Sequence, residues 1–324
     1  MPLPIAIIAG EPNSISSEII FKMWKLRKKN KYVPFFIIGS RFLLTLQKNK
    51  LKHNISIKEI GKKFTLKSLK GNNLPLLNVE YKQKKAFQKI SKKSNNYIFK
   101  CFDIAEKLIK EKKIKGFINC PISKETLLGK KYRGITEFLA TKSRKKGNEV
   151  MLLFNKKLSV SPLTTHIPIK DVSKKINKIK IIKKIKIIDN FYKKNFNKKP
   201  KIAILGLNPH NYSFGKQSEE KNVILPAIKA LKKSKINVIG PISPDASFVY
   251  CKTNKIDLIF GMYHDQVLTS FKTLFEYNAI NITLGLPYIR VSPDHGVASN
   301  ITGKNVANPK SLMESIKFFN LLNK

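Results

Sequence analysis

The chain has 324 residues and a formal net charge of +44, with 64 lysines and arginines against 20 aspartates and glutamates. This length is near the limit for one hydrophobic core, so we expect two lobes, and 42% hydrophobic residues exclude a disordered chain. The three cysteines lie far apart in the sequence, which excludes a disulfide framework or a CxxC metal site and favours a reducing, cytoplasmic location.

The kind of basic residue argues against nucleic acid as a partner. Of the 64 basic residues 59 are lysine and only 5 are arginine, the side chain that forks onto guanine edges and phosphates. The lysines are scattered along the chain, which is typical of a solvated basic surface, and a polyanion-binding protein is kept as a distant alternative. No apolar run approaches the roughly 20 residues of a membrane-spanning helix, so no membrane partner is expected.

Short apolar runs bounded by Gly or Pro predict buried strands. We interpret the first run, at the N-terminus, as a strand and not as a signal peptide. In chain order these runs are PIAIIAG (4–10), PFFIIGS (34–40), GFINCPI (116–122), KIAILGL (201–207), INVIGPI (236–242), DLIFGMY (257–263) and AINITLGL (279–286).

Amphipathic segments between these runs predict helices, at 17–29, 222–233 and 311–322. The lysine-rich segment 170–200 predicts a surface helix with one buried stripe, formed by Ile176, Ile179, Ile182, Ile185 and Ile188. Alternating strands and helices predict an α/β protein with a largely parallel sheet.

Four of the five histidines directly follow a predicted strand, where ligands gather in α/β proteins. They are His166, His210, His264 and His295; His53, in a lysine-rich stretch, is the exception. A histidine at such a place can be a simple polar capping residue. Three neutral imidazoles, however, also form a suitable ligand set for a divalent cation, assembled from distant segments or from two subunits.

Other polar residues suit a phosphorylated substrate. Lys124 and Thr136 stand at expected helix starts, where backbone N–H groups favour phosphate. Arg290 follows a strand and is one of only five arginines, which favours an anion clamp, and Lys272 and Asn281 complete the set. No G-x-G-x-x-G follows a strand, so a nicotinamide cofactor would have to bind without that fingerprint.

Taken in order, AGEP, PISKETL, GITEF, TTHIP, GLNPH, MYHDQ, NITLGLPYIRVSPDHG and ITGK resemble the 4-hydroxythreonine-4-phosphate dehydrogenase family over nearly the whole chain. The resemblance implies a divalent metal (zinc, magnesium or cobalt) held by His166, His210 and His264. It implies a homodimer with shared active sites, in which the third histidine reaches the partner's site. It also implies substrate contacts at Thr136, Lys272, Asn281 and Arg290.

The resemblance further implies a two-lobed fold like that of the isocitrate and isopropylmalate dehydrogenases, with a central cleft. By this analogy residues 1–118 and 246–324 form the first lobe, and 119–245 form the second, with the dimerisation and metal sites. HGVASNITGKNVANP (295–309) is similar to the loop that holds the adenosine of NAD in those enzymes, which suggests His295 and Asn308 as cofactor contacts.

The implied reaction is the oxidation of 4-phosphooxy-L-threonine by NAD, or NADP, to a 3-keto acid that decarboxylates to 3-amino-1-hydroxyacetone phosphate in pyridoxine and pyridoxal 5'-phosphate biosynthesis. We take Lys124 as the candidate proton shuttle. Asp245 and Asp265 are expected to act on the ligand histidines.

Two departures from the family pattern keep a sister dehydrogenase, acting on another phosphorylated hydroxy acid, as the alternative. The GHTEF motif has a histidine that contacts the substrate phosphate, and this chain has Ile135 in its place. The GEPxGIGPE opening is GEPNSISSE here, without its two later glycines.

Overall fold

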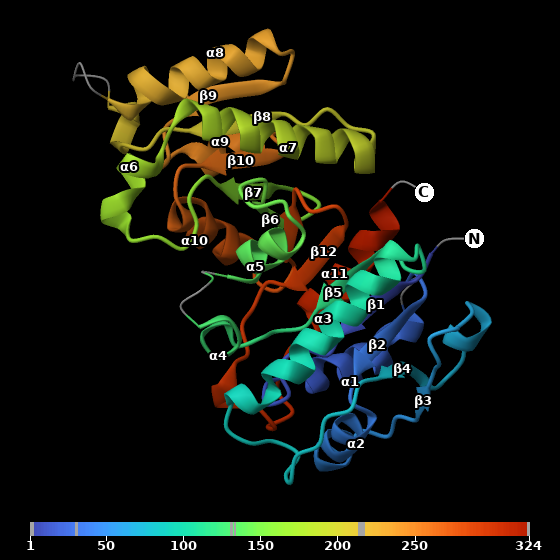
Figure 1. The fold of residues 1–324 in the computed structure, drawn as a ribbon. Coiled ribbons are helices and arrows are strands. Elements are labelled where there is room, and N and C mark those ends of the chain that lie inside the picture. The colour runs from blue at the N-terminus through green and yellow to red at the C-terminus, as the bar shows by residue number, and fades with distance from the viewer. Residues whose placement is uncertain (1–2, 30–31, 130–131, 133, 213–217, 323–324) are drawn as a thin grey trace. The chain divides into compact units, whose positions relative to one another are not determined.

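The computed structural model describes residues 3–29, 32–129, 132, 134–212 and 218–322. The chain forms two compact units (Figure 1). Unit 1 contains Met1–Ile135 and Tyr288–Leu322, and unit 2 contains Thr136–Pro287. Each unit has a sheet covered by helices, so the predicted α/β class with mostly parallel strands is confirmed.

The sheet of unit 1 is parallel at every pair of neighbouring strands that the structure describes. Its strands are buried on both faces, as β1 shows with four side chains that are 0% exposed. The strand order is β3 (Ile57–Glu59), β4 (Leu74–Asn78), β2 (Phe35–Gly39), β1 (Ile5–Ile8), β5 (Gly116–Asn119) and β12 (Ile289–Pro293).

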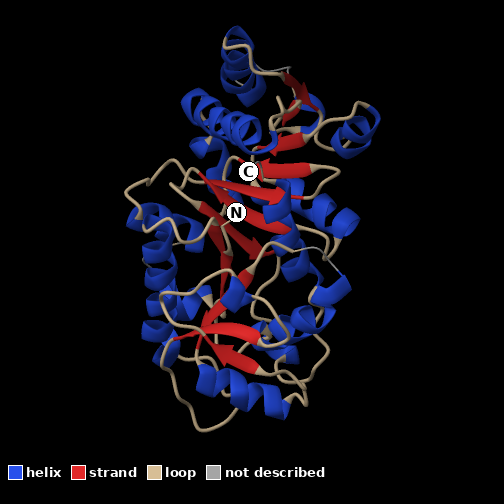
Figure 2. Ribbon diagram, turned by 90° about the vertical axis from the view of Figure 1, so that its right-hand side faces the viewer, coloured by secondary structure: helices blue, strands red, loops and turns tan. Residues whose placement is uncertain are grey.

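Helices flank the strands of each unit (Figure 2). In unit 1, α3 (Asn95–Lys110) packs on β1, β2 and β5, and α1 (Ser16–Leu26) packs against α2 (Arg41–Lys50) and α11 (Lys310–Leu321). Serine side chains begin two of the helices. Ser40 accepts a hydrogen bond from Leu43 N at α2, and Ser123 accepts one from Thr126 N at the short α4 (Lys124–Leu128).

The sheet of unit 2 is mixed. Its strand order is β11 (Ile280–Leu284), β6 (Val150–Phe154), β7 (Ser159–Pro162), β10 (Leu258–Gly261), β8 (Ile202–Leu205) and β9 (Val238–Ile242). Strands β7, β10, β8 and β9 are parallel neighbours, whereas β6 is antiparallel to both β11 and β7. Its helices are α5 (Ile135–Lys142, which begins at the last residue of unit 1), α6 (Val172–Lys175), α7 (Lys178–Phe196), α8 (Leu225–Lys233), α9 (Ser247–Thr253) and α10 (His264–Phe275).

Every apolar run predicted as a strand contains one, but two other expectations are corrected by the structure. The stripe expected on 170–200 is wrong at Ile179, which is 77% exposed, because α7 begins only at Lys178 and buries Ile181, Ile185, Ile188 and Tyr192 at true helical spacing. The lobe boundaries expected at 118/119 and 245/246 lie instead at 135/136 and 287/288, because β10 and β11 pair with strands of unit 2.

None of the helices in the described part of the chain is long and apolar enough to cross a membrane.

Candidate active site

Three histidines of unit 2 follow three neighbouring parallel strands. His166 comes after β7, His264 after β10 and His210 after β8, and β10 lies between the other two strands. Because the carboxyl ends of parallel strands lie along one edge of a sheet, this topology brings the three loops together at that edge. His264 is the first residue of α10.

The structure places His166 and His264 side by side, with ring centroids 5.9 Å apart. Their loops are fastened to each other just beyond the strands. Leu163 N donates to Gly261 O, and both the backbone N–H and the hydroxyl of Thr164 donate to Met262 O, the hydroxyl at 2.8 Å. The hydrogen bonds between β7 and β10 therefore continue beyond the strands, to within two residues of each of the two histidines.

Each of the three imidazoles has its Nδ1 facing a carboxylate. The Nδ1–oxygen distances are 2.9 Å from His264 to Asp265, 3.8 Å from His166 to Glu137 and 3.8 Å from His210 to Asp245. At 2.9 Å the Asp265 carboxylate favours a proton on His264 Nδ1, which leaves the lone pair of Nε2 for a metal. The other two carboxylates lie beyond hydrogen-bond distance and act on their histidines through charge. The two aspartates are those that the sequence analysis named; Glu137 is not.

Glu137 is the main site residue that the sequence analysis missed. Its Oε1 faces His166 and accepts a hydrogen bond from the Thr165 hydroxyl, and its Oε2 is buried without a hydrogen-bond partner. Burial acts to raise the pKa of Glu137, but the interactions with His166 and Thr165 outweigh it and hold the pKa below the usual value. The carboxylate is therefore ionised beside His166 at neutral pH.

Thr136 and Asn281, both expected substrate contacts, lie at one face of β11. The Thr136 hydroxyl is 3.2 Å from the hydroxyl of Thr283, and Thr283 and Asn281 are two residues apart on that strand, so they point to the same face. The side-chain oxygen of Asn281 is buried without a hydrogen-bond partner. Glu137 directly follows Thr136, so the start of α5 contributes one residue to the polar groups at β11 and one to the histidine pair.

His210 lies on an exposed turn, and its side chain is 83% exposed. The turn is held from below by Glu220, whose Oε1 accepts hydrogen bonds from Leu207 N and Asn208 N, both at 2.8 Å. His210 and Asn211 both have left-handed backbone conformations, with φ of 52° and 54°. Such strain in residues other than glycine is typical of functional sites.

Two histidine side chains of one chain are placed to bind a single divalent cation. His166 and His264 are only about one-third exposed, and their spacing allows both Nε2 atoms to reach one ion. Among the residues that the structure describes, no three His, Cys, Asp or Glu side chains form a group able to hold a metal.

Two further predicted substrate contacts differ in burial. Lys272 is exposed in the last turn of α10, eight residues beyond His264, which corresponds to about 12 Å along the helix axis. Arg290, on β12 of unit 1, is 1% exposed, and its Nε donates to the side-chain oxygen of Asn119 at 2.6 Å. The Arg290 guanidinium is therefore held rigidly.

Two predicted residues lie near the boundary of unit 1. Lys124 begins α4 as expected, with an exposed side chain. Ile135, which stands where the family has a phosphate-binding histidine, begins α5 and is 6% exposed.

The expected cofactor residues His295 and Asn308 lie in unit 1, on the segment between β12 and α11. His295 Nδ1 is 3.1 Å from Gly296 O. Asn308 is exposed, and its side-chain oxygen accepts a hydrogen bond from Lys310 N at the start of α11. The residues of this segment are suited to a dinucleotide because they offer an exposed amide next to a helix N-terminus.

Lys184 is a second residue that the sequence analysis missed, because it is one of many lysines in the segment 170–200. Its Nζ donates to Leu163 O at 2.8 Å, three residues before His166. Burial lowers the pKa of Lys184, and the negative charges of Glu149 and Glu137 oppose that shift. This lysine supports the loop that carries His166.

Comparison with known proteins gives one consistent result. Residues 31–319 match the family model described as pyridoxal phosphate biosynthetic protein PdxA. The chain is 41% identical over 323 residues to the 4-hydroxythreonine-4-phosphate dehydrogenase of Sulfurihydrogenibium sp. (strain YO3AOP1), covering 98% of both chains.

Two other proteins extend the comparison. The chain is 31% identical over 321 residues to the D-threonate 4-phosphate dehydrogenase of Salmonella typhimurium, covering 97% of each. The crystal structure of 4-hydroxythreonine-4-phosphate dehydrogenase from Klebsiella pneumoniae superposes with a TM-score of 0.84 at 27% identity, covering 98% of this chain and 99% of that one.

Proposed function

The chain belongs to the PdxA family of pyridoxal phosphate biosynthetic proteins, and from this premise we propose that it is the dehydrogenase that oxidises 4-phosphooxy-L-threonine. The product would be a 3-keto acid that decarboxylates to 3-amino-1-hydroxyacetone phosphate. Its carboxylate lies β to the new ketone, so loss of carbon dioxide is electronically easy. The observation that carries the proposal is that α5 places Thr136 against β11, which carries Asn281, and Glu137 against His166, which lies beside His264.

These residues would bind two different parts of the substrate. The Thr136 hydroxyl and the Asn281 amide would hold the phosphate, and His166 and His264 would hold a divalent cation, with zinc, magnesium or cobalt as candidates. When bound, such a cation supplies a positive charge that lowers the pKa of the substrate hydroxyl. The hydride acceptor would be NAD or NADP, held by His295 and Asn308.

Three cationic residues complete the proposal. Arg290 is rigid and suited to a fixed anion, and the exposed Lys272 can move to meet one. Lys124, exposed at the start of α4, is the proposed proton shuttle. Asp245 and Asp265 would orient His210 and His264 through Nδ1. The hydrogen bond from the Ser243 hydroxyl holds the pKa of Asp245 below its usual value, with smaller contributions from backbone hydrogen bonds and the charge of His210.

We further propose a homodimer in which the metal ligands come from two chains. The resemblance had implied that the third histidine, His264, crosses to the partner. The close pairing of His166 and His264 within one chain instead supports His210 as the ligand that crosses. Its 83% exposure and its place on a strained turn suit a side chain that reaches another subunit.

An apolar surface on α9 and α10 supports association of two chains. Val249 on α9 and Leu274 on α10 are 75% and 58% exposed, and both line a cavity of about 690 Å³ together with Phe248 and Phe275. Exposed apolar clusters of this kind mark interaction surfaces. The apolar residues lie at the C-terminal end of α10, and Leu274 is about 15 Å along the helix axis from His264 at its start.

The deciding experiment measures NADH formation from 4-phosphooxy-L-threonine before and after removal of divalent metal with a chelator. We expect activity that is lost with the metal and restored when the metal is returned. Equal rates with and without chelator would contradict the proposed site, and absence of turnover at every metal tested would contradict the reaction.

A second candidate substrate is D-threonate 4-phosphate. Two observations favour it as the competitor: the 31% identity to a D-threonate 4-phosphate dehydrogenase, and Ile135 in place of the phosphate-binding histidine. Both substrates carry a phosphate and a secondary hydroxyl, so the same groups could hold either. Comparing kcat/KM for the two compounds on one preparation distinguishes the candidates, because the larger value identifies the better-bound transition state.

A further inference from the structure

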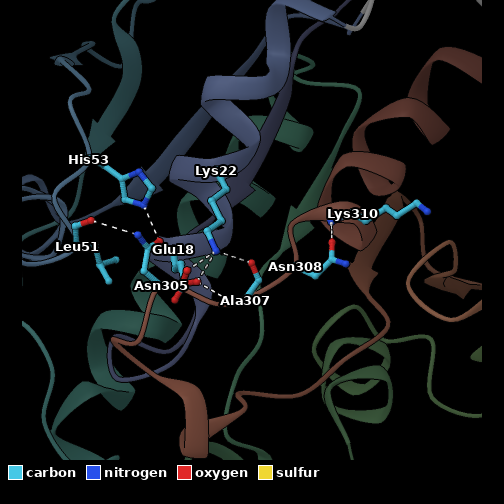
Figure 3. A network of polar contacts seen from close by, with 8 residues as sticks. All are labelled: Glu18, Lys22, Leu51, His53, Asn305, Ala307, Asn308 and Lys310. Carbon is cyan, nitrogen blue, oxygen red and sulfur yellow. Dashed lines mark hydrogen bonds and ion pairs between the residues drawn. The ribbon is translucent and has the colours of Figure 1, made fainter.

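A half-buried lysine of α1 binds the segment between β12 and α11. Lys22 Nζ donates to Asn305 O and Ala307 O, both at 2.9 Å, and to Glu18 Oε1 at 2.8 Å (Figure 3). These three acceptors use all three hydrogen atoms of the ammonium group. Lys22 is therefore anchored to α1 through Glu18 and to the segment through two carbonyls.

Glu18 contacts the same segment directly. Its side chain is 0% exposed, and its Oε1 accepts a hydrogen bond from Ala307 N as well as from Lys22. Residue 307 is thus held at both its N–H and its carbonyl oxygen. Glu18 Oε1 thus accepts two hydrogen bonds, while Oε2 is buried without a partner. A charged group held by several hydrogen bonds fixes a geometry more sharply than exposed contacts do.

His53 holds the segment from a second side. Its Nε2 lies 3.2 Å from the side-chain oxygen of Asn305, whose nitrogen donates to Leu51 O (Figure 3). Since that oxygen can only accept, His53 carries its proton on Nε2 and is the donor. Asn305 has φ of 60°, so its side-chain bonds also hold a backbone conformation that few residues other than glycine adopt.

What this network fixes is the pair of residues that face away from it. Val306 lies between the two carbonyls bound by Lys22, and its side chain is 63% exposed. Asn308 is exposed as well, and because its oxygen accepts from Lys310 N, its NH₂ group is left at the surface. An aliphatic side chain beside an amide donor matches an adenine ring, which has an apolar face and acceptor nitrogens at its edge.

We infer that Glu18, Lys22 and His53 are positioning residues for dinucleotide binding, which rests on the proposed function. They touch no ligand themselves, and they hold residues 305–308 so that Val306 and Asn308 meet the adenosine half of NAD. This assigns a role to His53, the one histidine that does not follow a strand.

The test compares dinucleotide binding with metal binding in the same protein. Affinity for NAD, and separately for NADP, is measured by calorimetric titration in the parent, in Lys22→Met and in Asn305→Gly, and affinity for Co²⁺ is measured in each as the reference. Lys25→Met is the matched control, because Lys25 is exposed on the same helix. Asn305→Gly keeps the left-handed backbone while it removes both side-chain bonds.

We expect the dissociation constant for the better-bound dinucleotide to rise about 10-fold or more in Lys22→Met and several-fold in Asn305→Gly, with Co²⁺ affinity unchanged. The control should match the parent. His53→Gln, which keeps a donor at the position of Nε2, should bind the dinucleotide nearly as well as the parent, and His53→Leu should not. If His53 served folding alone, His53→Gln and His53→Leu proteins of equal melting temperature would bind the dinucleotide equally well.

Lys22→Met leaves the Glu18 carboxylate buried without its cation, so the double variant Glu18→Gln/Lys22→Met is measured as well. If these variants fold and bind the dinucleotide as tightly as the parent, the positioning role is overturned while the proposed function stands. A parent that binds neither NAD nor NADP would overturn both.

Discussion

In unit 2 the histidines follow β7, β10 and β8, and the hydrogen bonds between these strands already determine where each loop begins. In unit 1 the segment 295–309 crosses from β12 to α11 with one short 3₁₀ turn at Ser299–Ile301, and its position depends on side chains of α1 and on His53. The first arrangement is built by the backbone of a sheet. The second depends on a few buried polar atoms, so single substitutions should affect the two regions differently.

The largest effect is expected when a ligand is removed from the sheet edge. His166→Ala or His264→Ala should lower metal affinity and NADH formation by orders of magnitude, because each removes an imidazole that nothing nearby replaces. The melting temperature should stay close to that of the parent, since the strands and their ladder are untouched.

Titration with Co²⁺ and thermal unfolding measure the two properties, and His53→Leu is the control from the other region. If His53→Leu lost metal affinity, or if His264→Ala kept it, metal binding would not depend on the histidines of unit 2 alone, and the prediction would be wrong.

Mixing inactive variants tests which histidine crosses between subunits. After subunit exchange, His166→Ala with His210→Ala should recover about a quarter of the parent activity, because half of the dimers are hybrids and each contains one intact site. His166→Ala with His264→Ala should recover none, since both ligands come from the same chain. Recovery in the second mixture alone would show that His264 is the ligand that crosses.

A smaller effect is expected from the carboxylate behind His166. Glu137→Gln keeps the shape but removes the charge that orients the imidazole, so metal affinity should fall 10- to 100-fold, roughly as for outer-shell partners elsewhere. Glu125→Gln on α4 is a control at an exposed position. Equal metal affinity in Glu137→Gln and the parent would mean that the backbone alone orients His166.

The smallest effect is a pH dependence in unit 1. Burial first, and then the charge of Lys25, lower the pKa of His53 below 6.5, although the Asn305 contact opposes the shift. The stabilisation from neutral His53 is therefore complete above pH 6.5 and is lost as the pH falls from there toward the lowered value. The free energy of unfolding of the parent should fall more steeply than that of His53→Gln below pH 6.5, as denaturant titrations can measure.

The sequence was informative wherever burial or strand ends decided the outcome. Runs such as PIAIIAG and DLIFGMY are buried on both faces, so their composition alone predicts strands, and the histidines after them could be found in the same way. The spacing of three among the isoleucines of 170–200 does not mark one helix face, because it joins Ile176, which lies before α7, to residues inside the helix.

Pairings between distant side chains had no local signal. Glu137 and His166 are 29 residues apart, and Glu18 and Ala307 are 289 apart, so neither contact follows from periodicity. The altered GEPNSISSE opening shows the same limit. Ser14 and Ser16 stand where the family motif has glycines. Their hydroxyls bond to each other and to the carbonyls of Glu11 and Pro121, which composition alone could not reveal.

The left-handed backbone at His210 has a consequence for how this protein can change. A residue with a Cβ in that conformation costs about 1 kcal/mol or more relative to glycine, whereas Asn, as at position 211, adopts it more readily. Selection for thermal endurance alone would therefore favour glycine at position 210, and the same change would delete an imidazole from the site. Directed evolution of this chain toward heat resistance should drift toward stable, inactive proteins unless turnover is selected at every round.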